Sequence, residues 1–130
     1  MKLRFNNAEL DIQLNPGLYR FSGESASGKT MLLTMLRAYS QFDKSVSICA
    51  ITYDENLYGL VPTKLKSQDW DIIMLDRLDM YFDSEICKAL LELCGKSVVL
   101  LDIKDNTILQ QIPTTYVNLE MEKDRIEVSV

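Results

Sequence analysis

A glycine-rich segment that ends in lysine and threonine is the part of this sequence best suited to chemistry. It reads Gly23-Glu24-Ser25-Ala26-Ser27-Gly28-Lys29-Thr30 and fits the P-loop pattern G-x-x-x-x-G-K-[ST]. In that pattern the glycines allow turns whose N–H groups converge on phosphates, Lys29 reaches the β- and γ-phosphates, and the Thr30 hydroxyl coordinates Mg²⁺. A chance match in such a chain has a probability on the order of 1 in 200. The segment therefore predicts a binding site for a nucleoside triphosphate, with Thr30 also a metal ligand.

The flanking sequence predicts the elements that would hold this loop. Leu18–Ser22 is typical of a strand that leads directly into the glycine-rich segment. A helix is expected from Lys29 to about Ser40, because apolar residues recur there at helical spacing. Its positive N-terminal end would face the bound phosphates.

Two aspartates follow short apolar segments and could complete a Mg²⁺ shell. Asp76 follows Ile72–Leu75, and Asp102 follows Val98–Leu101. A P-loop works with an aspartate at the end of a neighbouring strand. Asp76 is favoured as the metal ligand because it comes first in the expected order, and Asp102 remains the alternative.

The order of expected elements predicts an α/β fold, with a P-loop NTPase-like three-layer sheet in a single domain, residues 1–130. Apolar segments such as 72–75 are typical of central parallel strands that are covered on both faces. Antiparallel strands are expected at the N-terminus (Lys2–Phe5 with Glu9–Leu14) and at the C-terminus (Tyr116–Met121 with Arg125–Val130). Residues 53–70 are expected to form a loop with one helical turn around Thr63–Ser67.

Composition excludes several classes of protein. The formal net charge is −5 and no cluster of lysine and arginine stands out, which argues against a nucleic-acid partner. No apolar run is long enough to cross a bilayer. Three cysteines without any histidine exclude a His/Cys zinc site, and reduced thiols in a cytoplasmic protein are the simplest interpretation.

Beyond the loop, the sequence resembles the nucleotide-binding core of the ATP-binding-cassette (ABC) ATPases. The segment GESASGKT is similar to that family's GxSGSGKS/T form, with Ala26 where a glycine is usual. The stretch from Asn15 to Tyr19 resembles the family's antiparallel entry into the loop. The residues from Asp76 to Asp83 keep the spacing of its LDEPTSxLD segment. The resemblance implies that Asp76 is the Walker B aspartate.

The chain also departs from the family in ways that bear on hydrolysis. The stretch between Lys29 and Asp76 is too short for the family's helical subdomain, and no LSGGQ-like signature is present. Arg77 stands where a glutamate usually follows Asp76, and the switch histidine is missing. Arginine is a permanent cation with donors only, so it cannot act as a general base. Asp79 and Asp102 are the carboxylates that remain as catalytic candidates.

These observations predict binding of ATP with Mg²⁺, and hydrolysis that is weak or depends on a protein partner. One alternative is a nucleotide-binding interaction module without turnover. Another is a small-molecule or nucleoside kinase, although no arginine-rich lid is visible. The base could rest on Phe5 at the end of the first strand; a core position for that ring is the other interpretation.

Overall fold

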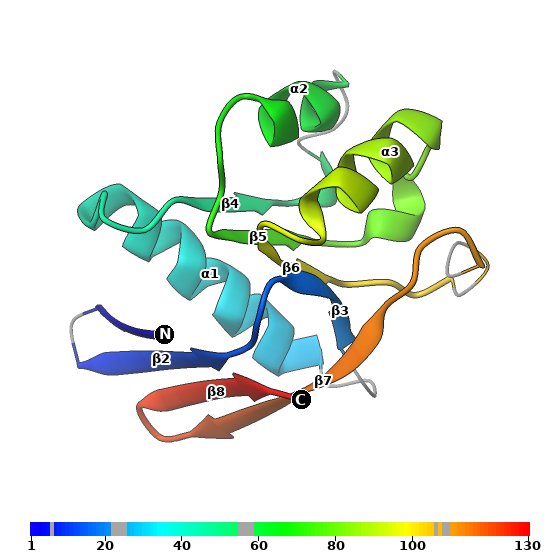
Figure 1. The fold of residues 1–130 in the computed structure, drawn as a ribbon. Helices are drawn as coiled ribbons and strands as arrows, with labels where there is room; N and C mark the ends of the chain where they lie inside the picture. The colour runs from blue at the N-terminus through cyan, green and yellow to red at the C-terminus, as the bar shows by residue number, and fades with distance from the viewer. Residues whose placement is uncertain (6, 22–25, 55–58, 106, 108–109) are drawn as a thin grey trace.

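The chain folds around one curled sheet of eight strands in the order β1-β2-β8-β7-β3-β6-β5-β4 (Figure 1). The computed structural model describes residues 1–5, 7–21, 26–54, 59–105, 107 and 110–130, and only the backbone of residues 5, 26 and 27. The strands are β1 (Lys2–Phe5), β2 (Ala8–Gln13), β3 (Gly17–Phe21), β4 (Ile48–Ile51), β5 (Ile72–Leu75), β6 (Val98–Leu101), β7 (Thr115–Glu122) and β8 (Arg125–Ser129). The helices are α1 (Ala26–Phe42), α2 (Leu60–Lys66), α3 (Ser84–Leu93) and a 3₁₀ turn, η2 (Leu78–Met80). The expected α/β class is confirmed.

Five neighbouring strands, β7, β3, β6, β5 and β4, run parallel to one another. Every residue of β4, β5 and β6 is buried, as their apolar sequences predicted. Residues 72, 98 and 17 lie side by side across β5, β6 and β3, so these strands begin at one edge of the sheet. Their carboxyl ends therefore meet at the opposite edge.

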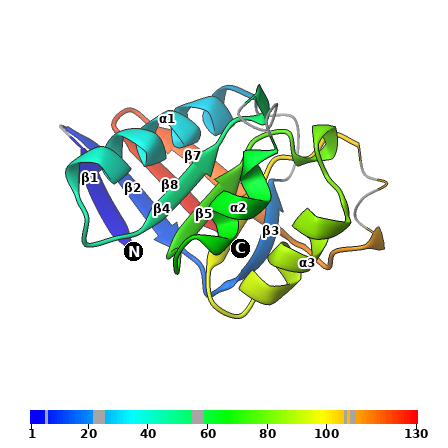
Figure 2. The ribbon, with the colours of Figure 1, turned by 90° about the horizontal axis from the view of Figure 1, so that it is seen from above.

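Helices cover the two faces of this parallel region. Side chains on one face, including Tyr19, Met74 and Leu100, pack with Leu32 and Leu36 of α1. Side chains on the other face pack with α2, η2 and α3; they include Leu18, Cys49, Leu75, Val99 and Leu101. Figures 1 and 2 show α2 and α3 together on one side of β4 and β5, with α1 on the other. The alternation of side chains along each strand thus divides the core into two layers.

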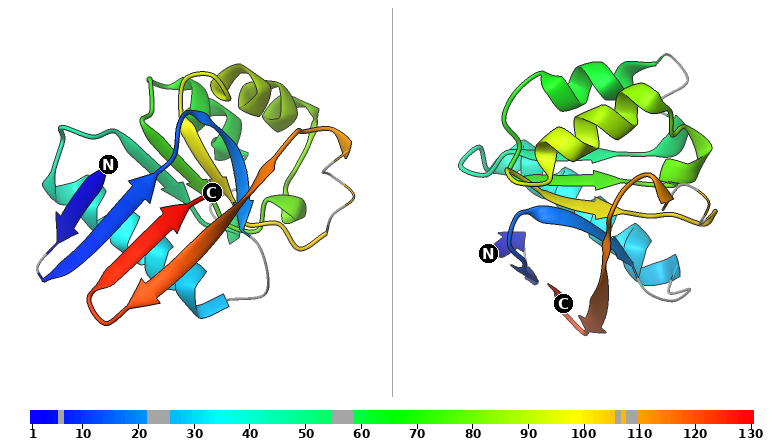
Figure 3. Two further views of the ribbon diagram at one scale, coloured as in Figure 1. Left: turned by 60° about the horizontal axis from the view of Figure 1, so that its bottom comes forward. Right: turned by 45° about the vertical axis from the view of Figure 1, so that its right-hand side comes forward.

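The three remaining strands, β1, β2 and β8, extend the sheet around α1. β7 links the two regions, since its first half pairs with β3 and its second half pairs antiparallel with β8. β8 then pairs parallel with β2, and β2 pairs antiparallel with β1. Figure 3 shows these strands side by side, with α1 behind them. Both terminal antiparallel pairs were predicted, whereas the parallel pairing of β2 with β8 was not.

The chain reverses its direction across the sheet at β3. From β3 it passes through α1 to the edge strand β4, returns through β5 to β6 beside β3, and then places β7 on the other side of β3. In open parallel sheets such a switch point leaves a crevice at the carboxyl ends of the strands, where ligands bind. In the described ranges no helix combines the length and apolar character that a membrane crossing requires.

Two local expectations needed correction. Helix α1 begins at Ala26, earlier than the expected start at Lys29, so Gly28 and Lys29 lie in its first turn. The stretch 53–70 contains a helix of two turns, α2, where only one turn was expected. Val61, Pro62 and Leu65 of this helix are buried, and burial against the neighbouring elements stabilises a segment with little helical signal of its own.

Candidate functional site

Three strand ends and one helix start bring the predicted chemical groups together. Lys29 lies in the first turn of α1, which follows β3 after the segment 22–25. Asp102 directly follows β6, and Asp76 directly follows β5. Because β6 lies between β3 and β5, the order across the site is Lys29, Asp102, Asp76. This is the carboxyl edge of the sheet, beside the switch point at β3.

Lys29 and Asp102 form a largely buried ion pair. The Lys29 ammonium donates a hydrogen bond of 2.9 Å to Asp102 Oδ1, across 73 residues of sequence. The two side chains are only 18% and 8% exposed. Asp102 Oδ2 also accepts the backbone N–H of Arg77 at 3.2 Å. Asp102 is therefore held by a charge-assisted bond from one neighbouring element and a backbone donor from the other.

Asp76 lies against Asp102, and the two carboxyl groups perturb each other. Burial, a hydrogen bond with Asp102 and the charge of Asp102 together raise the pKa of Asp76 to about 6. Burial also opposes the ionisation of Asp102, but its hydrogen bonds from Lys29 and Asp76 hold its pKa below the usual value. When the pair carries one proton, that proton is therefore on Asp76, while Asp102 stays ionised beside Lys29. Two adjacent carboxyl groups with one ammonium create a site that would gain from another cation.

The residue after Asp76 adopts a backbone conformation that is rare for its type. Arg77 has φ 51° and ψ 51°, in the left-handed region. Its N–H is directed at Asp102 by this turn, and the following residue, Leu78, donates its N–H to the Asp102 carbonyl at 2.8 Å. The Arg77 guanidinium lies 3.7 Å from Asp79, a long contact for an ion pair. The left-handed turn thus fixes the loop after β5 onto the end of β6.

The catalytic candidate Asp79 is engaged in the same loop packing. Its side chain is 8% exposed, and Asp79 Oδ1 accepts the backbone N–H of Lys104 at 3.0 Å. The carboxylate therefore joins η2 to the segment that follows β6. The structure brings Asp102, rather than Asp79, into contact with Lys29.

An apolar groove lies along the middle of α1, on the side of the helix roughly opposite Lys29. Its volume is about 380 Å³. Its walls come from α1 and from the tips of the two terminal hairpins; they are Met31, Thr34, Met35, Ala38, Asn7, Ala8 and Asp124. Phe5, predicted to carry the base, pairs through its backbone with Ala8. The position of its ring lies outside the part of the chain that the structure describes.

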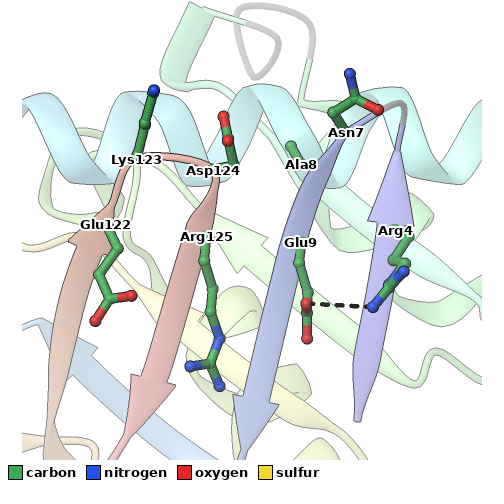
Figure 4. A pocket seen from close by; sticks show the side chains of 8 residues that line it. All are labelled: Arg4, Asn7, Ala8, Glu9, Glu122, Lys123, Asp124 and Arg125. Atoms are coloured by element: carbon green, nitrogen blue, oxygen red, sulfur yellow. Dashed lines mark ion pairs between the residues drawn. The ribbon is translucent and has the colours of Figure 1, made fainter.

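A second hollow, of about 450 Å³, lies between the same two hairpins and is lined mainly by charged residues. Figure 4 shows its side chains along β1, β2, β7 and β8 with α1 behind the strands. Arg4 pairs there with Glu9 at 3.6 Å, and Arg125 lies 2.9 Å from the buried Asp11. These pairs satisfy the charges of a solvated sheet face. None of the site residues predicted from the sequence lines this hollow.

The remaining predicted ligands are only partly described. Gly23, Glu24 and Ser25 lie outside the described residues, and so do the side chains of Ala26 and Ser27. Gly28 is buried and Thr30 is exposed on α1. Within the described ranges no group of three acidic or cysteine side chains surrounds a common point. Mg²⁺ bound together with phosphates takes only one or two carboxylates from the protein, and Asp76 with Asp102 would meet that need.

Comparisons with protein-family models, with curated proteins and with solved structures found no match to this chain. Its chemistry must therefore be argued from the site itself. That site combines a lysine in the first turn of a helix with two adjacent carboxyl groups. Such an arrangement can hold an anion together with a divalent cation.

Proposed function

We propose that this chain binds a nucleoside triphosphate, in the first place ATP, as its Mg²⁺ complex, and that it is a P-loop protein of ABC-ATPase-like type. The observation that carries the proposal is the position of Lys29. It is the lysine of a G-x-x-x-x-G-K-T segment, lies in the first turn of the helix after a parallel strand at the switch point, and its ammonium is 2.9 Å from a strand-end carboxylate. Phosphates are bound at such helix starts by backbone N–H groups and the lysine.

The surrounding groups support this ligand over a bare anion. A Mg²⁺ ion held by Thr30 and Asp76 would neutralise charge on both the phosphates and the carboxyl pair. The proposed ligand thus matches the lysine and the two strand-end carboxyl groups of the site.

Hydrolysis is proposed to be weak or to depend on a protein partner. Arg77 occupies the position after Asp76 and cannot take a proton from water. Asp79 is committed to the Lys104 N–H. The three cysteines are free thiols, which fits a reducing compartment such as the cytoplasm. A module that binds nucleotide without turnover is the second candidate, and the same Arg77 favours it.

Binding is tested with a fluorescent ATP analogue in the presence of Mg²⁺. The native chain should bind at micromolar to millimolar concentration, and Lys29→Met should weaken binding at least tenfold. Lys44→Met is the matched control, because Lys44 lies just beyond the far end of α1 and donates to the Ser40 carbonyl at the exposed surface. Asp76→Asn should reduce the gain that Mg²⁺ brings. If the native chain binds neither ATP nor GTP, the proposal fails.

Turnover is tested separately by phosphate release. Release that Lys29→Met abolishes supports an ATPase, whereas tight binding without release supports the interaction module. Competition with tripolyphosphate measures the share of the base and ribose. Equal affinities for tripolyphosphate and ATP would show that the base and ribose add nothing to binding.

A further inference from the structure

The Lys29 ammonium, which would bind phosphate, is paired with a carboxylate of the same chain. Lys29 donates to Asp102 at 2.9 Å, with both side chains largely buried. Lys29 lies in the helix that follows β3, Asp102 follows β6, and β3 and β6 are neighbours in the sheet. Neither side chain has to leave its own element to make the contact. The pair is therefore built into the sheet and does not depend on a loose surface contact.

A phosphate at Lys29 must compete with this carboxylate. When the ammonium turns to a phosphate, Asp102 keeps the Arg77 N–H as donor but loses the ammonium that pairs with it. The adjacent Asp76 carboxyl adds further negative charge beside it. A buried ionised group that loses its partner carries a large desolvation penalty. Anion binding alone is therefore opposed by Asp102.

On the basis of the proposed function, we propose that Asp102 restrains Lys29 in the nucleotide-free protein and makes nucleotide binding depend on a divalent cation. A cation beside Asp76 replaces the positive charge that Asp102 gives up when Lys29 turns to the phosphate. Free nucleotide brings no such replacement and must break the pair unaided. Asp102 thus selects the metal complex of the nucleotide over the metal-free form.

The matched pair Asp102→Asn and Asp76→Asn tests this role. Each change removes one negative charge from the same cluster, but only Asp102 touches the Lys29 ammonium. Binding of a fluorescent ATP analogue is measured in excess EDTA and in excess Mg²⁺. In EDTA we expect Asp102→Asn to bind about tenfold or more tightly than the native chain, the factor associated with a hydrogen bond to a charged group. Asp76→Asn should change this affinity about threefold at most, because it acts only through longer-range charge.

The outcomes separate this inference from the proposed function. If the native chain binds the Mg²⁺ complex but Asp102→Asn gains no more in EDTA than Asp76→Asn, the restraint by Asp102 is wrong and nucleotide binding stands. If no variant binds with or without Mg²⁺, both are wrong. Asp102→Ser provides a second neutral variant should asparagine impair folding, and the same gain is expected from it.

A second measurement follows Lys29 directly. The rate of lysine acylation, read by mass spectrometry of peptides, should be low at Lys29 in the native chain and higher in Asp102→Asn. Lys44 is the internal reference, because its contact with the Ser40 carbonyl is exposed. Equal protection of Lys29 in both proteins would overturn the restraint.

Discussion

Removing the Lys29 ammonium should destabilise the fold more than removing the Asp102 charge. Lys29→Met keeps most of the apolar stem but leaves a carboxylate that is 8% exposed without its ammonium. Breaking a buried pair from one side costs about 3–5 kcal/mol. Lys29 is itself 18% exposed and the Arg77 N–H remains on Asp102, so solvent and this donor offset part of the loss. We expect a decrease of about 2–3 kcal/mol in the free energy of unfolding.

Removing the Asp102 charge should lower the free energy of unfolding by less. Asp102→Asn leaves an ammonium on a flexible four-carbon stem, which can move its charge into water. It also removes the repulsion between Asp102 and Asp76. The expected loss is about 1 kcal/mol or less. In the double variant Lys29→Met with Asp102→Asn no buried charge is left unpaired, so it should be more stable than Lys29→Met alone.

Urea unfolding at pH 7 measures these differences, followed by circular dichroism and by the fluorescence of Trp70, the single tryptophan. Equal m-values would show that the variants unfold from equally compact states. Arg4→Met is the control, because Arg4 is 80% exposed and lies 3.6 Å from Glu9; its loss should cost less than about 0.5 kcal/mol. A double variant less stable than Lys29→Met, or an Asp102→Asn at least as damaging as Lys29→Met, would refute the argument.

Other predictions concern the loops around this pair. Arg77→Gly should be more stable than Arg77→Ala by about 1 kcal/mol in urea unfolding, because the left-handed backbone strains any residue with a Cβ; equal stabilities would contradict it. Asp83→Ala should cost about 1 kcal/mol, since Asp83 accepts the Ile86 N–H at 2.8 Å as the N-cap of α3, and Asp83→Ser should restore most of it. Asp76→Asn should gain stability relative to the native chain as the pH rises from 4 to 7, by about 1 kcal/mol after allowance for solvent exposure. Because the pKa of Asp76 is raised to about 6 in the folded chain, the free energy of unfolding of the native chain falls as Asp76 ionises. Unfolding curves of both proteins between pH 4 and 7 measure this change. A difference in stability that does not vary with pH would disprove the raised pKa.

The central strands were predictable because their local pattern and their environment agree. Segments such as Ile72–Leu75 contain only apolar residues, and each of these is buried between helices on both faces. The two terminal hairpins were predictable from turn residues between alternating segments. Their mutual pairing was not, because β2 and β8 lie at opposite ends of the sequence. The backbone bonds that join them, such as Glu9 N–H to Asp124 O at 2.8 Å, and the ion pair of Arg125 with Asp11 connect residues more than a hundred positions apart. Such bonds leave no trace in side-chain periodicity.

The stretch 53–70 was difficult for another reason. Helix α2 is short, and Pro62 and the lysines Lys64 and Lys66 give it no continuous amphipathic pattern. Val61 and Leu65 are each 1% exposed, packed in the layer that α3 also forms. Isolated helices of this length are unstable in water, so burial against the sheet and α3 stabilises it. A property that depends on neighbours from distant sequence cannot be read from the segment alone.

The choice between Asp76 and Asp102 shows why strand order matters more than chain order at this site. Along the sequence Asp76 comes first, and both aspartates follow segments of the same character. In space β6 lies next to β3, and β5 lies one strand further away. Neighbouring strands are about 4.8 Å apart, so Asp102 starts about one spacing from β3 and Asp76 about two. A lysine in the first turn of the helix after β3 therefore meets Asp102 first. The more distant Asp76 lies beside that pair, and an additional cation would be needed to balance its charge.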